Sequence, residues 1–255
     1  MKNLFSYEGK RVVIAGCFSG MGEAAAKILL SLGAEVHGLD YKDVDLPLAS
    51  FNKVDLRDTA SIDSVVKKIG GNVDAVFYAA GLPGSTFPPL EVMKVNFLSA
   101  RYFIEAMVPL MTKGGSIVSI SSTAGAGWVQ RIPTNMELIA TKSWEEGLKW
   151  CENHLDVVTE GYAFSKEALI VYTMFQGSHL IKKGIRVNTI LPGPTQTPMM
   201  KDFEAAAPMA VLEAVTQPIN RRSTPEEQAW PLVFLNSDAA SYVNGLAFPV
   251  DGGFT

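Results

Sequence analysis

The sequence predicts an α/β protein built as a doubly wound, mostly parallel sheet of seven strands with helices on both faces. Three observations support this fold class. Short apolar runs alternate with helix-forming stretches, the runs are apolar at nearly every position, and a glycine-rich turn joins the first run to the first helix. Alternating strands and helices favour a parallel sheet, and continuous apolar runs indicate strands covered on both faces.

The strands and helices are expected at regular intervals along the chain. The pattern predicts strands at residues 11–15, 35–40, 52–56, 74–79, 116–120, 185–190 and 246–250. It predicts helices at residues 23–32, 59–69, 90–111, 135–155, 160–181 and 225–235. Two connections, 41–51 and 82–89, are short, contain proline and lack helical periodicity, so we expect loops there.

The composition predicts one globular domain that spans residues 1–255. Of the 255 residues, 47% are apolar and 19% are charged, which excludes a disordered chain. At this length, folding buries roughly 70–75% of the surface of the unfolded chain, so a core forms without disulfides or metals. The sequence shows no repeat, low-complexity stretch or linker that would separate two domains.

Charge and residue usage exclude several classes of function. The 22 basic and 26 acidic side chains give a net charge of −4 without a basic run, so we expect neither a nucleic-acid nor a membrane partner. The three histidines are scattered, so no metal site is predicted. Two cysteines, an N-terminus without the apolar core of a signal peptide, and the lack of a membrane-spanning apolar run predict a soluble, cytoplasmic protein.

A glycine-rich turn follows the first predicted strand. It contains Gly16, Gly20 and Gly22, with Ser19 and Met21 between them, and it opens the first predicted helix. Small residues let the backbone approach a pyrophosphate, and a helix N-terminus offers free N–H groups and the positive end of a dipole. This context favours a dinucleotide-binding loop over a plain tight turn.

Asp40 ends the second predicted strand, close behind the glycine-rich turn. An acid at this place accepts hydrogen bonds from the adenosine ribose hydroxyls and repels a 2′-phosphate, which favours NAD over NADP. Lys42 is near enough to soften that repulsion. The alternative interpretation is a solvated aspartate at the end of a strand.

Tyr162 and Lys166 lie four positions apart in a predicted helix, so they share one helix face. A tyrosine has a pKa of about 10, which a neighbouring ammonium lowers, so the pair is a candidate proton-transfer unit. Ser121 and Ser122 end the fifth predicted strand, at the edge where ligands of such sheets bind. Asn96 interrupts an apolar helical pattern, and its spacing alone predicts a surface or capping side chain.

Taken in order, these features resemble the short-chain dehydrogenase/reductase family. The resemblance covers nearly the whole chain and rests on motifs that are modest singly and specific together. They are Gly16-x3-Gly20-x-Gly22, Asp40, Asp55, Ala79-Ala80-Gly81, Asn96, Ile120-Ser121-Ser122, Tyr162-x3-Lys166, Arg186-Val187-Asn188, Pro192-Gly193 and Asp251-Gly252-Gly253. The family's usual Asn-Ala-Gly is Ala-Ala-Gly in this chain, which removes one side-chain hydrogen bond but not the turn.

The resemblance implies a single-domain Rossmann fold and four catalytic residues. By resemblance, Tyr162 is the acid/base, Ser122 holds the substrate oxygen, and Lys166 binds the nicotinamide ribose and lowers the pKa of Tyr162. Asn96 resembles the family's helix asparagine that orients a water of the proton relay. The function implied is hydride transfer between a nicotinamide and a carbinol or carbonyl carbon.

The resemblance also implies NAD as the cofactor, with NADP less favoured. Asp55 resembles the position that contacts the adenine, and Ile190 and Thr197 resemble those that fix the carboxamide. The full set of implied cofactor-binding residues is Gly16, Ser19, Gly20, Met21, Gly22, Asp40, Asp55, Leu56, Ala80, Gly81, Tyr162, Lys166, Ile190, Pro192, Gly193, Thr195 and Thr197.

Ser122 and Tyr162 are further apart than is common in the family, so we expect a helical insert near residues 126–160. Together with the short early connections, this resembles a bacterial subgroup, the 3α-hydroxysteroid dehydrogenase/carbonyl reductases. The insert either alters the surfaces through which many family members pair or is a surface elaboration without a role in substrate choice. Both interpretations stay open.

The stretch near residues 198–222 resembles the family's mobile substrate lid. It is rich in Met and carries Phe203, and a Met-rich lid repacks readily around an apolar substrate. The alternative is an ordinary amphipathic core helix. We therefore expect an apolar substrate such as a hydroxysteroid or alicyclic carbonyl compound, ahead of a small polar ketone or diketone.

The function predicted from these features is NAD(H)-dependent interconversion of a secondary alcohol and a ketone by a homodimer or homotetramer. Two other functional classes fit the sequence less well. A nucleotide-sensing regulator on the same fold usually lacks the tyrosine or lysine, which are present here. An epimerase or dehydratase of the extended branch typically carries a substantial C-terminal substrate domain, which is absent here.

Overall fold

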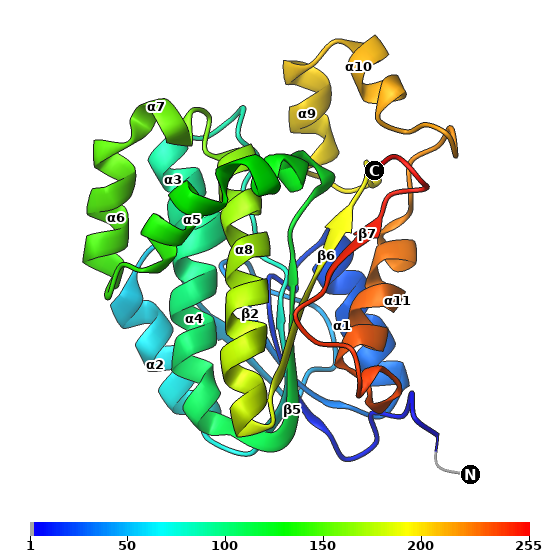
Figure 1. The fold of residues 1–255 in the computed structure, drawn as a ribbon. Coiled ribbons are helices and arrows are strands. Elements are labelled where there is room, and N and C mark those ends of the chain that lie inside the picture. The colour runs from blue at the N-terminus through cyan, green and yellow to red at the C-terminus, as the bar shows by residue number, and fades with distance from the viewer. Residues whose placement is uncertain (1–2) are drawn as a thin grey trace.

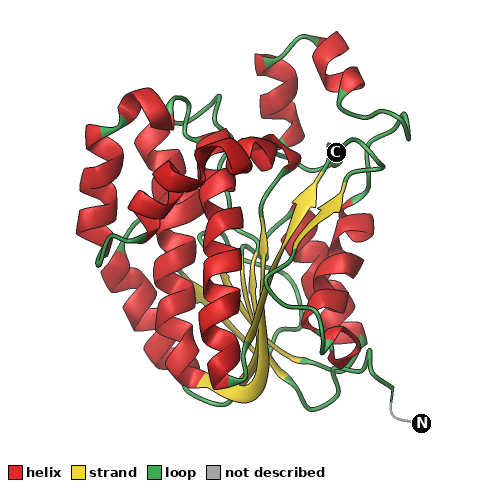
Figure 2. Cartoon of the chain, in the orientation of Figure 1, coloured by secondary structure: helices red, strands yellow, loops and turns green. Residues whose placement is uncertain are grey.

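A parallel sheet of seven strands runs through the centre of the computed structural model, which describes residues 3–255 (Figure 2). The strands lie in the order β3-β2-β1-β4-β5-β6-β7, and every neighbouring pair is parallel. Their bounds are β1 Arg11–Ala15, β2 Glu35–Asp40, β3 Ser50–Lys53, β4 Val73–Tyr78, β5 Met111–Ile120, β6 Arg186–Pro192 and β7 Ala247–Val250. The predicted doubly wound α/β fold is confirmed.

The direction of winding reverses between β1 and β4. The chain passes outward from β1 to β3 and returns to place β4 on the other side of β1. In sheets of this kind, ligands bind outside the carboxyl ends of the strands at the reversal point. The glycine-rich turn follows β1, and Ala79-Ala80-Gly81 follows β4, so both lie at this point.

Five helices cover the two faces of the sheet (Figure 1). On one face lie α2 Thr59–Ile69, α4 Ser99–Met107 and α8 Tyr162–Leu180, and on the other lie α1 Gly20–Ser31 and α11 Pro225–Asn236. Two hydrophobic clusters, one on each face, bury the apolar side chains of these helices against the strands. Burial on both faces explains why the strands are apolar at successive positions.

The helical stretch predicted at 90–111 is present at residues 89–110, but it is not α-helical throughout. The chain forms α3 Pro89–Met93, a π-helical turn at Lys94–Leu98, and α4, and a 3₁₀ turn at Val108–Leu110 then leads into β5. Pro109 has no backbone N–H to donate to the preceding turn of a helix. The helical stretch therefore ends close to this residue. The third strand is also shifted, because β3 pairs with β2 only from Ser50 to Lys53.

The helix predicted at 135–155 is not continuous. A 3₁₀ segment at Thr123–Arg131 leads into α5 Ile132–Ile139, α6 Trp144–Asn153 and α7 Leu155–Val158. The break before α6 is fixed by Ser143, whose hydroxyl accepts a hydrogen bond from the backbone N–H of Glu146. The connections at 41–49 and 82–88 contain no helix, as predicted.

The segment 198–222 projects beyond the carboxyl edge of the sheet (Figure 1). It forms two short helices, α9 Met200–Ala206 and α10 Met209–Ala214. Pro208 separates them and serves as the residue before the first turn of α10. In residues 3–255, no helix is both long and apolar enough to cross a membrane.

Candidate active site

The glycine-rich turn is pressed against the end of β4. A Cβ on Gly16 would overlap the backbone nitrogen of Ala80, and a Cβ on Gly22 would overlap the carbonyl oxygen of Gly16. Glycine is therefore required at both places. Ser19 precedes α1 and makes no side-chain cap hydrogen bond, so this side chain leaves the first N–H groups of the helix available to an anion.

Asp40 lies beside the same turn and is buried. Its carboxylate accepts hydrogen bonds from the backbone N–H groups of Phe18 at 3.0 Å, Tyr41 at 2.8 Å and Lys42 at 3.2 Å. The ammonium of Lys42 lies over the ring of Phe18, 4.9 Å from its centroid. The structure thus brings the acid at the end of β2 to the glycine-rich turn, as the sequence predicts.

Tyr162 and Lys166 stand on the first turns of α8, next to the end of β5. The ammonium of Lys166 donates a hydrogen bond to the carbonyl of Ile120 at 2.9 Å and lies 5.5 Å from the centroid of the Tyr162 ring. The hydroxyl of Tyr162 is hydrogen-bonded to Ser122. Ser121, in contrast, donates its hydroxyl proton to the carbonyl of Lys166 at 2.8 Å. The structure therefore assembles Ser122, Tyr162 and Lys166 and assigns Ser121 to holding α8.

Burial has the largest effect on the pKa values of Tyr162 and Lys166. Burial raises the pKa of Tyr162, and the hydrogen bond to Ser122 lowers it only in part. Burial lowers the pKa of Lys166 to about 8. The ammonium of Lys166 lies close to the Tyr162 ring, and its predicted lowering of the Tyr162 pKa stays a prediction.

Asn96 lies in the π-helical turn and is fully buried. Its side-chain amide donates to the carbonyl of Leu82 at 3.0 Å and to the hydroxyl of Ser165 at 3.2 Å, and its oxygen accepts from the N–H of Leu82 at 2.7 Å. The surface or capping side chain predicted from spacing is therefore wrong. Asn96 instead ties the loop after β4 to the helix that carries Tyr162, and π-helical turns are frequent at functional sites.

Gly81 stands where these groups converge. A Cβ at this position would lie 3.5 Å from the side-chain oxygen of Asn96 and 3.7 Å from the ammonium of Lys166. The absence of a side chain keeps this space open beside both groups. Gly81 therefore lies within reach of two predicted catalytic residues and one residue away from Ala80, which contacts the glycine-rich turn.

The segment after β6 reaches the site from the other side. Thr195 donates its hydroxyl proton to the carbonyl of Gly193 at 2.9 Å, and the methyl group of Thr197 lies 3.1 Å from where a Cβ on Gly20 would stand. Ile190 is buried within β6, and Pro192 ends that strand. Thr197 thus lies against the glycine-rich turn, and its predicted contact with the carboxamide stays a prediction.

Asp55, a predicted cofactor-binding residue, forms an ion pair with a neighbour in the chain. Its carboxylate is paired with the guanidinium of Arg57 at 2.7 Å, and hydrogen bonds from Arg57 lower its pKa. The neighbouring Leu56 is partly buried and packs against the core. Neither residue belongs to the group of contacts around Tyr162, and their predicted adenine contact stays a prediction.

The residues present fit a nicotinamide dinucleotide. The glycine-rich turn offers a close backbone approach and an uncapped helix N-terminus, Asp40 offers a carboxylate beside that turn, and Lys166 offers a buried ammonium. The glycines bring the turn close to Ala80 and to Thr197, and Gly81 lies close to Asn96 and Lys166. Among residues 3–255, no group of three or more His, Cys, Asp or Glu side chains is arranged to hold a metal ion.

Sequence reasoning missed several neighbours of Tyr162. Phe203 on α9 meets the Tyr162 ring at 5.2 Å between centroids, and a Cβ on Gly84 would lie 2.8 Å from the Cβ of Tyr162. Phe203 carried an apolar signal within 198–222, but no sequence pattern shows where that segment docks. The three residues come from separate parts of the chain, so only the folded structure brings them together.

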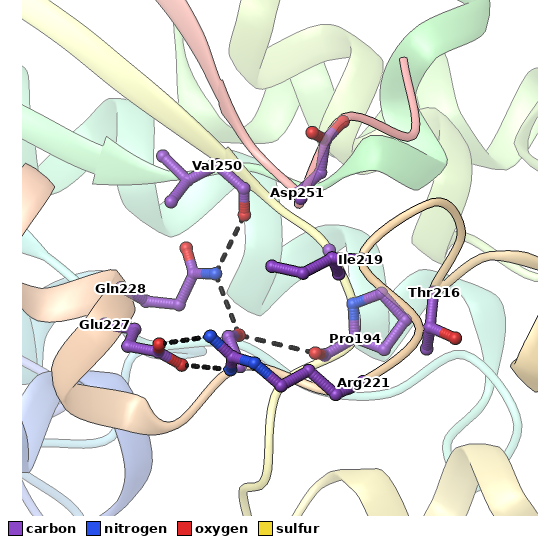
Figure 3. Close-up of a pocket in the computed structure, with 11 residues that line it drawn as sticks. Pro194, Thr216, Ile219, Arg221, Glu227, Gln228, Val250 and Asp251 are labelled. Atoms are coloured by element: carbon purple, nitrogen blue, oxygen red, sulfur yellow. Dashed lines mark hydrogen bonds and ion pairs between the residues drawn. The ribbon is translucent and has the colours of Figure 1, made fainter.

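A cavity of about 140 Å³ is lined in part by Gly193 and Pro194 (Figure 3). The ion pair of Arg221 with Glu227 closes one wall, with nitrogen–oxygen distances of 2.7 and 2.6 Å. Gln228 donates to the carbonyl of Val250 at 2.8 Å and to the hydroxyl of Ser223 at 2.9 Å. None of the predicted catalytic residues lines this cavity. The two hydrogen bonds of Gln228 link α11 to Ser223 and to the end of β7.

Comparison with known protein families decides the family. A family model described as "short chain dehydrogenase" matches residues 10–134. A second model, described as "Enoyl-(Acyl carrier protein) reductase", matches residues 155–255. The chain is also 33% identical to a coniferyl-alcohol dehydrogenase from Pseudomonas sp. (strain HR199 / DSM 7063), with 96% of each chain covered. The chain belongs to the short-chain dehydrogenase/reductase family. The predicted family and the predicted class of oxidoreductase are therefore confirmed.

Other relatives of this short-chain dehydrogenase/reductase agree with the fold and the subgroup. A 3-alpha-hydroxysteroid dehydrogenase/carbonyl reductase from Comamonas testosteroni is 32% identical, with 95% of each chain covered. The crystal structure of the 3-alpha-hydroxysteroid dehydrogenase from Pseudomonas sp. B-0831 complexed with NADH superposes with a TM-score of 0.80 at 23% identity, covering 96% of each chain. The family binds nicotinamide cofactors, so a cofactor of this class is supported.

Proposed function

We propose that this protein is an NAD(H)-dependent oxidoreductase. Its substrates would be an apolar secondary alcohol and the corresponding ketone, which it interconverts. The observation that carries the proposal is the assembly of Ser122, Tyr162 and Lys166 at the carboxyl edge of the sheet. This assembly lies at the same edge as the glycine-rich turn and Asp40. A proton-transfer unit and a dinucleotide cradle thus serve one reacting carbon.

Each residue of the assembly has a distinct part in the proposed reaction. A bound nicotinamide dinucleotide supplies the hydride donor or acceptor. The hydroxyl of Tyr162 gives its proton to the substrate oxygen during reduction and takes it back during oxidation. Ser122 holds the same oxygen, since its hydroxyl is already hydrogen-bonded to that of Tyr162. Lys166 places a positive charge beside the tyrosine and offers donors to a ribose hydroxyl.

The remaining predicted residues position the cofactor and the proton-transfer group. Asn96 holds the loop after β4 against α8, and we propose that its turn orients a water of the proton relay. Ile190 and Thr197 are proposed to fix the carboxamide, since the methyl group of Thr197 faces the glycine-rich turn. Asp40 is proposed to bind the adenosine ribose and so to favour NAD over NADP.

An apolar substrate is supported by the surroundings of Tyr162. Phe203 packs on the tyrosine ring, and the Cε of Met199 lies 3.9 Å from where a Cβ on Gly81 would stand. Two relatives are named for coniferyl alcohol and for a hydroxysteroid. These observations favour a ring-bearing carbonyl compound over a small polar ketone.

The proposed activity is tested with the purified protein and a panel of apolar ketones. We expect NADH to be oxidised with several members of the panel, at a higher kcat/KM than with NADPH. The control is pyruvate, a small polar keto acid, which we expect to react poorly. Tight NADH binding without turnover across the whole panel would contradict the proposal and point to a regulator.

We also propose that residues 1–255 form one oxidoreductase domain with a helical insert near 126–160 and a substrate lid near 198–222. The two family matches leave residues 135–154 uncovered, and this stretch contains all of α6. The lid is supported by the position of α9 over Tyr162. A cytoplasmic location is supported by Cys17 and Cys151, which are free, buried thiols whose pKa burial raises to about 12.

We propose that two copies pair through the outer face of α11. An apolar groove of about 340 Å³ lies on this face and is lined by Phe5, Trp230, Pro231, Val233, Phe234 and Phe248. The adjacent strand β7 is one of the two edge strands of the sheet within residues 3–255. An apolar patch beside an open strand edge is typical of an interface. This agrees with the homodimer or homotetramer expected from the sequence.

Replacing Trp230 by Arg is expected to break this pairing, because a charge would be buried in the groove. The oligomeric state is measured by size-exclusion chromatography with light scattering. The control is Leu155→Arg, which adds the same charge on α7, on the opposite side of the sheet (Figure 1). Dissociation of the Leu155 variant alone, or a monomeric wild type, would contradict the proposed interface.

A further inference from the structure

The ring of Phe203 stands directly beside the proposed acid/base. The two ring centroids are 5.2 Å apart, and the ring planes cross at 70°, so one ring presents its edge to the face of the other. Such an arrangement is a favourable aromatic contact. Phe203 is therefore an aromatic neighbour of the group to which a substrate oxygen would bind.

The position of Phe203 is fixed by its chain neighbour. The carboxylate of Asp202 accepts a hydrogen bond from the hydroxyl of Thr86 at 2.7 Å, and the carbonyl of Asp202 accepts one from Ser85 at 3.3 Å. Thr86 and Ser85 belong to the loop after β4, in which Gly84 lies against Tyr162. These contacts fasten α9 to the loop that borders the tyrosine.

The two faces of α9 differ in chemistry. On one face, Asp202 accepts a hydrogen bond from Thr86, and Glu204 pairs with Arg222. The side chains of Asp202 and Glu204 are partly exposed. Phe203 turns toward Tyr162, and Met199 just before α9 reaches toward Gly81. The side of this segment that faces the reacting groups is therefore apolar, and its nearest member to the acid/base is an aromatic ring.

We propose that Phe203 is a specificity-determining residue that selects ketones with a flat ring attached to, or containing, the carbonyl carbon. The hydrogen bond of Asp202 to Thr86 acts as a positioning contact, because it holds the phenyl ring over Tyr162. This inference rests on the proposed function, since it concerns the substrate of the same site. An aryl group fits face to edge against Phe203, whereas a flexible alkyl chain loses more conformational entropy to fill the same space.

The test compares two ketones with the same number of carbons, methyl phenyl ketone and methyl hexyl ketone. We expect Phe203→Ala to lower kcat/KM for the aryl ketone about tenfold and for the alkyl ketone less than about threefold. Phe203→Tyr keeps the ring and is expected to retain the preference. The matched control is Tyr242→Ala, which removes a fully exposed aromatic ring outside the segment 198–222 and should change neither value.

The positioning contact has its own pair of variants. Thr86→Val keeps the shape of the side chain but removes the hydroxyl that donates to Asp202. We expect it to raise KM for the aryl ketone several-fold with a smaller change in kcat, because the ring of Phe203 is held less firmly. Thr86→Ser restores the hydroxyl and should recover the wild-type KM, which a general packing defect would not allow.

The outcomes separate this inference from the proposed function. If Phe203→Ala lowers kcat/KM equally for both ketones, or for neither, the specificity role is wrong while the enzyme activity stands. If Thr86→Ser fails to recover what Thr86→Val loses, the positioning contact is wrong. If the wild-type protein binds NADH but reduces neither these two ketones nor any other carbonyl compound, the proposed function falls, and the inference falls with it.

Discussion

Replacing Tyr162 by Phe is expected to lower kcat by about 10²- to 10⁴-fold, the usual contribution of a positioned acid/base. The variant keeps the aromatic ring that contacts Phe203 and Lys166 and loses only the hydroxyl bonded to Ser122. The measurement is steady-state ketone reduction, accompanied by NADH titration and thermal unfolding. We expect the dissociation constant of NADH and the Tm to remain close to the wild-type values.

The matched control for this variant is Tyr102→Phe. Tyr102 donates its hydroxyl proton to the carboxylate of Asp63, on an exposed surface between α4 and α2. Removal of this hydroxyl should leave turnover unchanged, because it lies outside the site. Substantial residual turnover in Tyr162→Phe, or an equal loss in both variants, would remove Tyr162 from the proton transfer.

The second large effect is expected at Asp40. Asp40→Ala should shift the ratio of kcat/KM values for NADH and NADPH toward NADPH by about 10- to 100-fold. The carboxylate lies at the glycine-rich turn, where it would bind ribose hydroxyls and repel a 2′-phosphate. Without it, NADH loses hydrogen bonds to a charged group, and NADPH loses a repulsion.

The control variant for Asp40 removes a carboxylate from Asp43, which lies three residues after the end of β2. Asp43 is highly exposed and paired with Lys53 at 2.8 Å, away from the glycine-rich turn. Asp43→Ala should leave the cofactor ratio unchanged. If Asp40→Ala weakens both cofactors equally, Asp40 serves only to hold the backbone of Phe18, Tyr41 and Lys42.

The sheet was the most predictable part of the fold. Strands such as β1 and β2 match their predicted bounds, because burial on both faces leaves a continuous apolar run that short sequence windows reveal. Helix continuity was less predictable. Apolar spacing persists across 135–155, although the chain breaks before α6 at a cap from Ser143. A short break changes local hydrogen bonds without changing which side chains must be buried.

The same distinction applies to the site. The spacing of Tyr162 and Lys166 on one helix and the glycines of the first turn are local patterns, so the sequence indicated them directly. The burial of Asn96 was not predictable from spacing, because it depends on a π-helical turn and on a partner, Leu82, in a separate loop. Phe203 is a further case, since its contact with Tyr162 depends on how α9 docks.

The central claim is that one site transfers a hydride and a proton to a ketone. It is tested most directly by incubating the protein with a ring ketone and NADH that carries deuterium at both C4 positions, followed by mass spectrometry of the alcohol. We expect a single deuterium on the carbinol carbon with the wild-type protein and with Tyr102→Phe, and labelled alcohol to form about 10²- to 10⁴-fold more slowly with Tyr162→Phe. Label transfer that is unaffected by the loss of the Tyr162 hydroxyl, or an alcohol formed without label, would contradict the account.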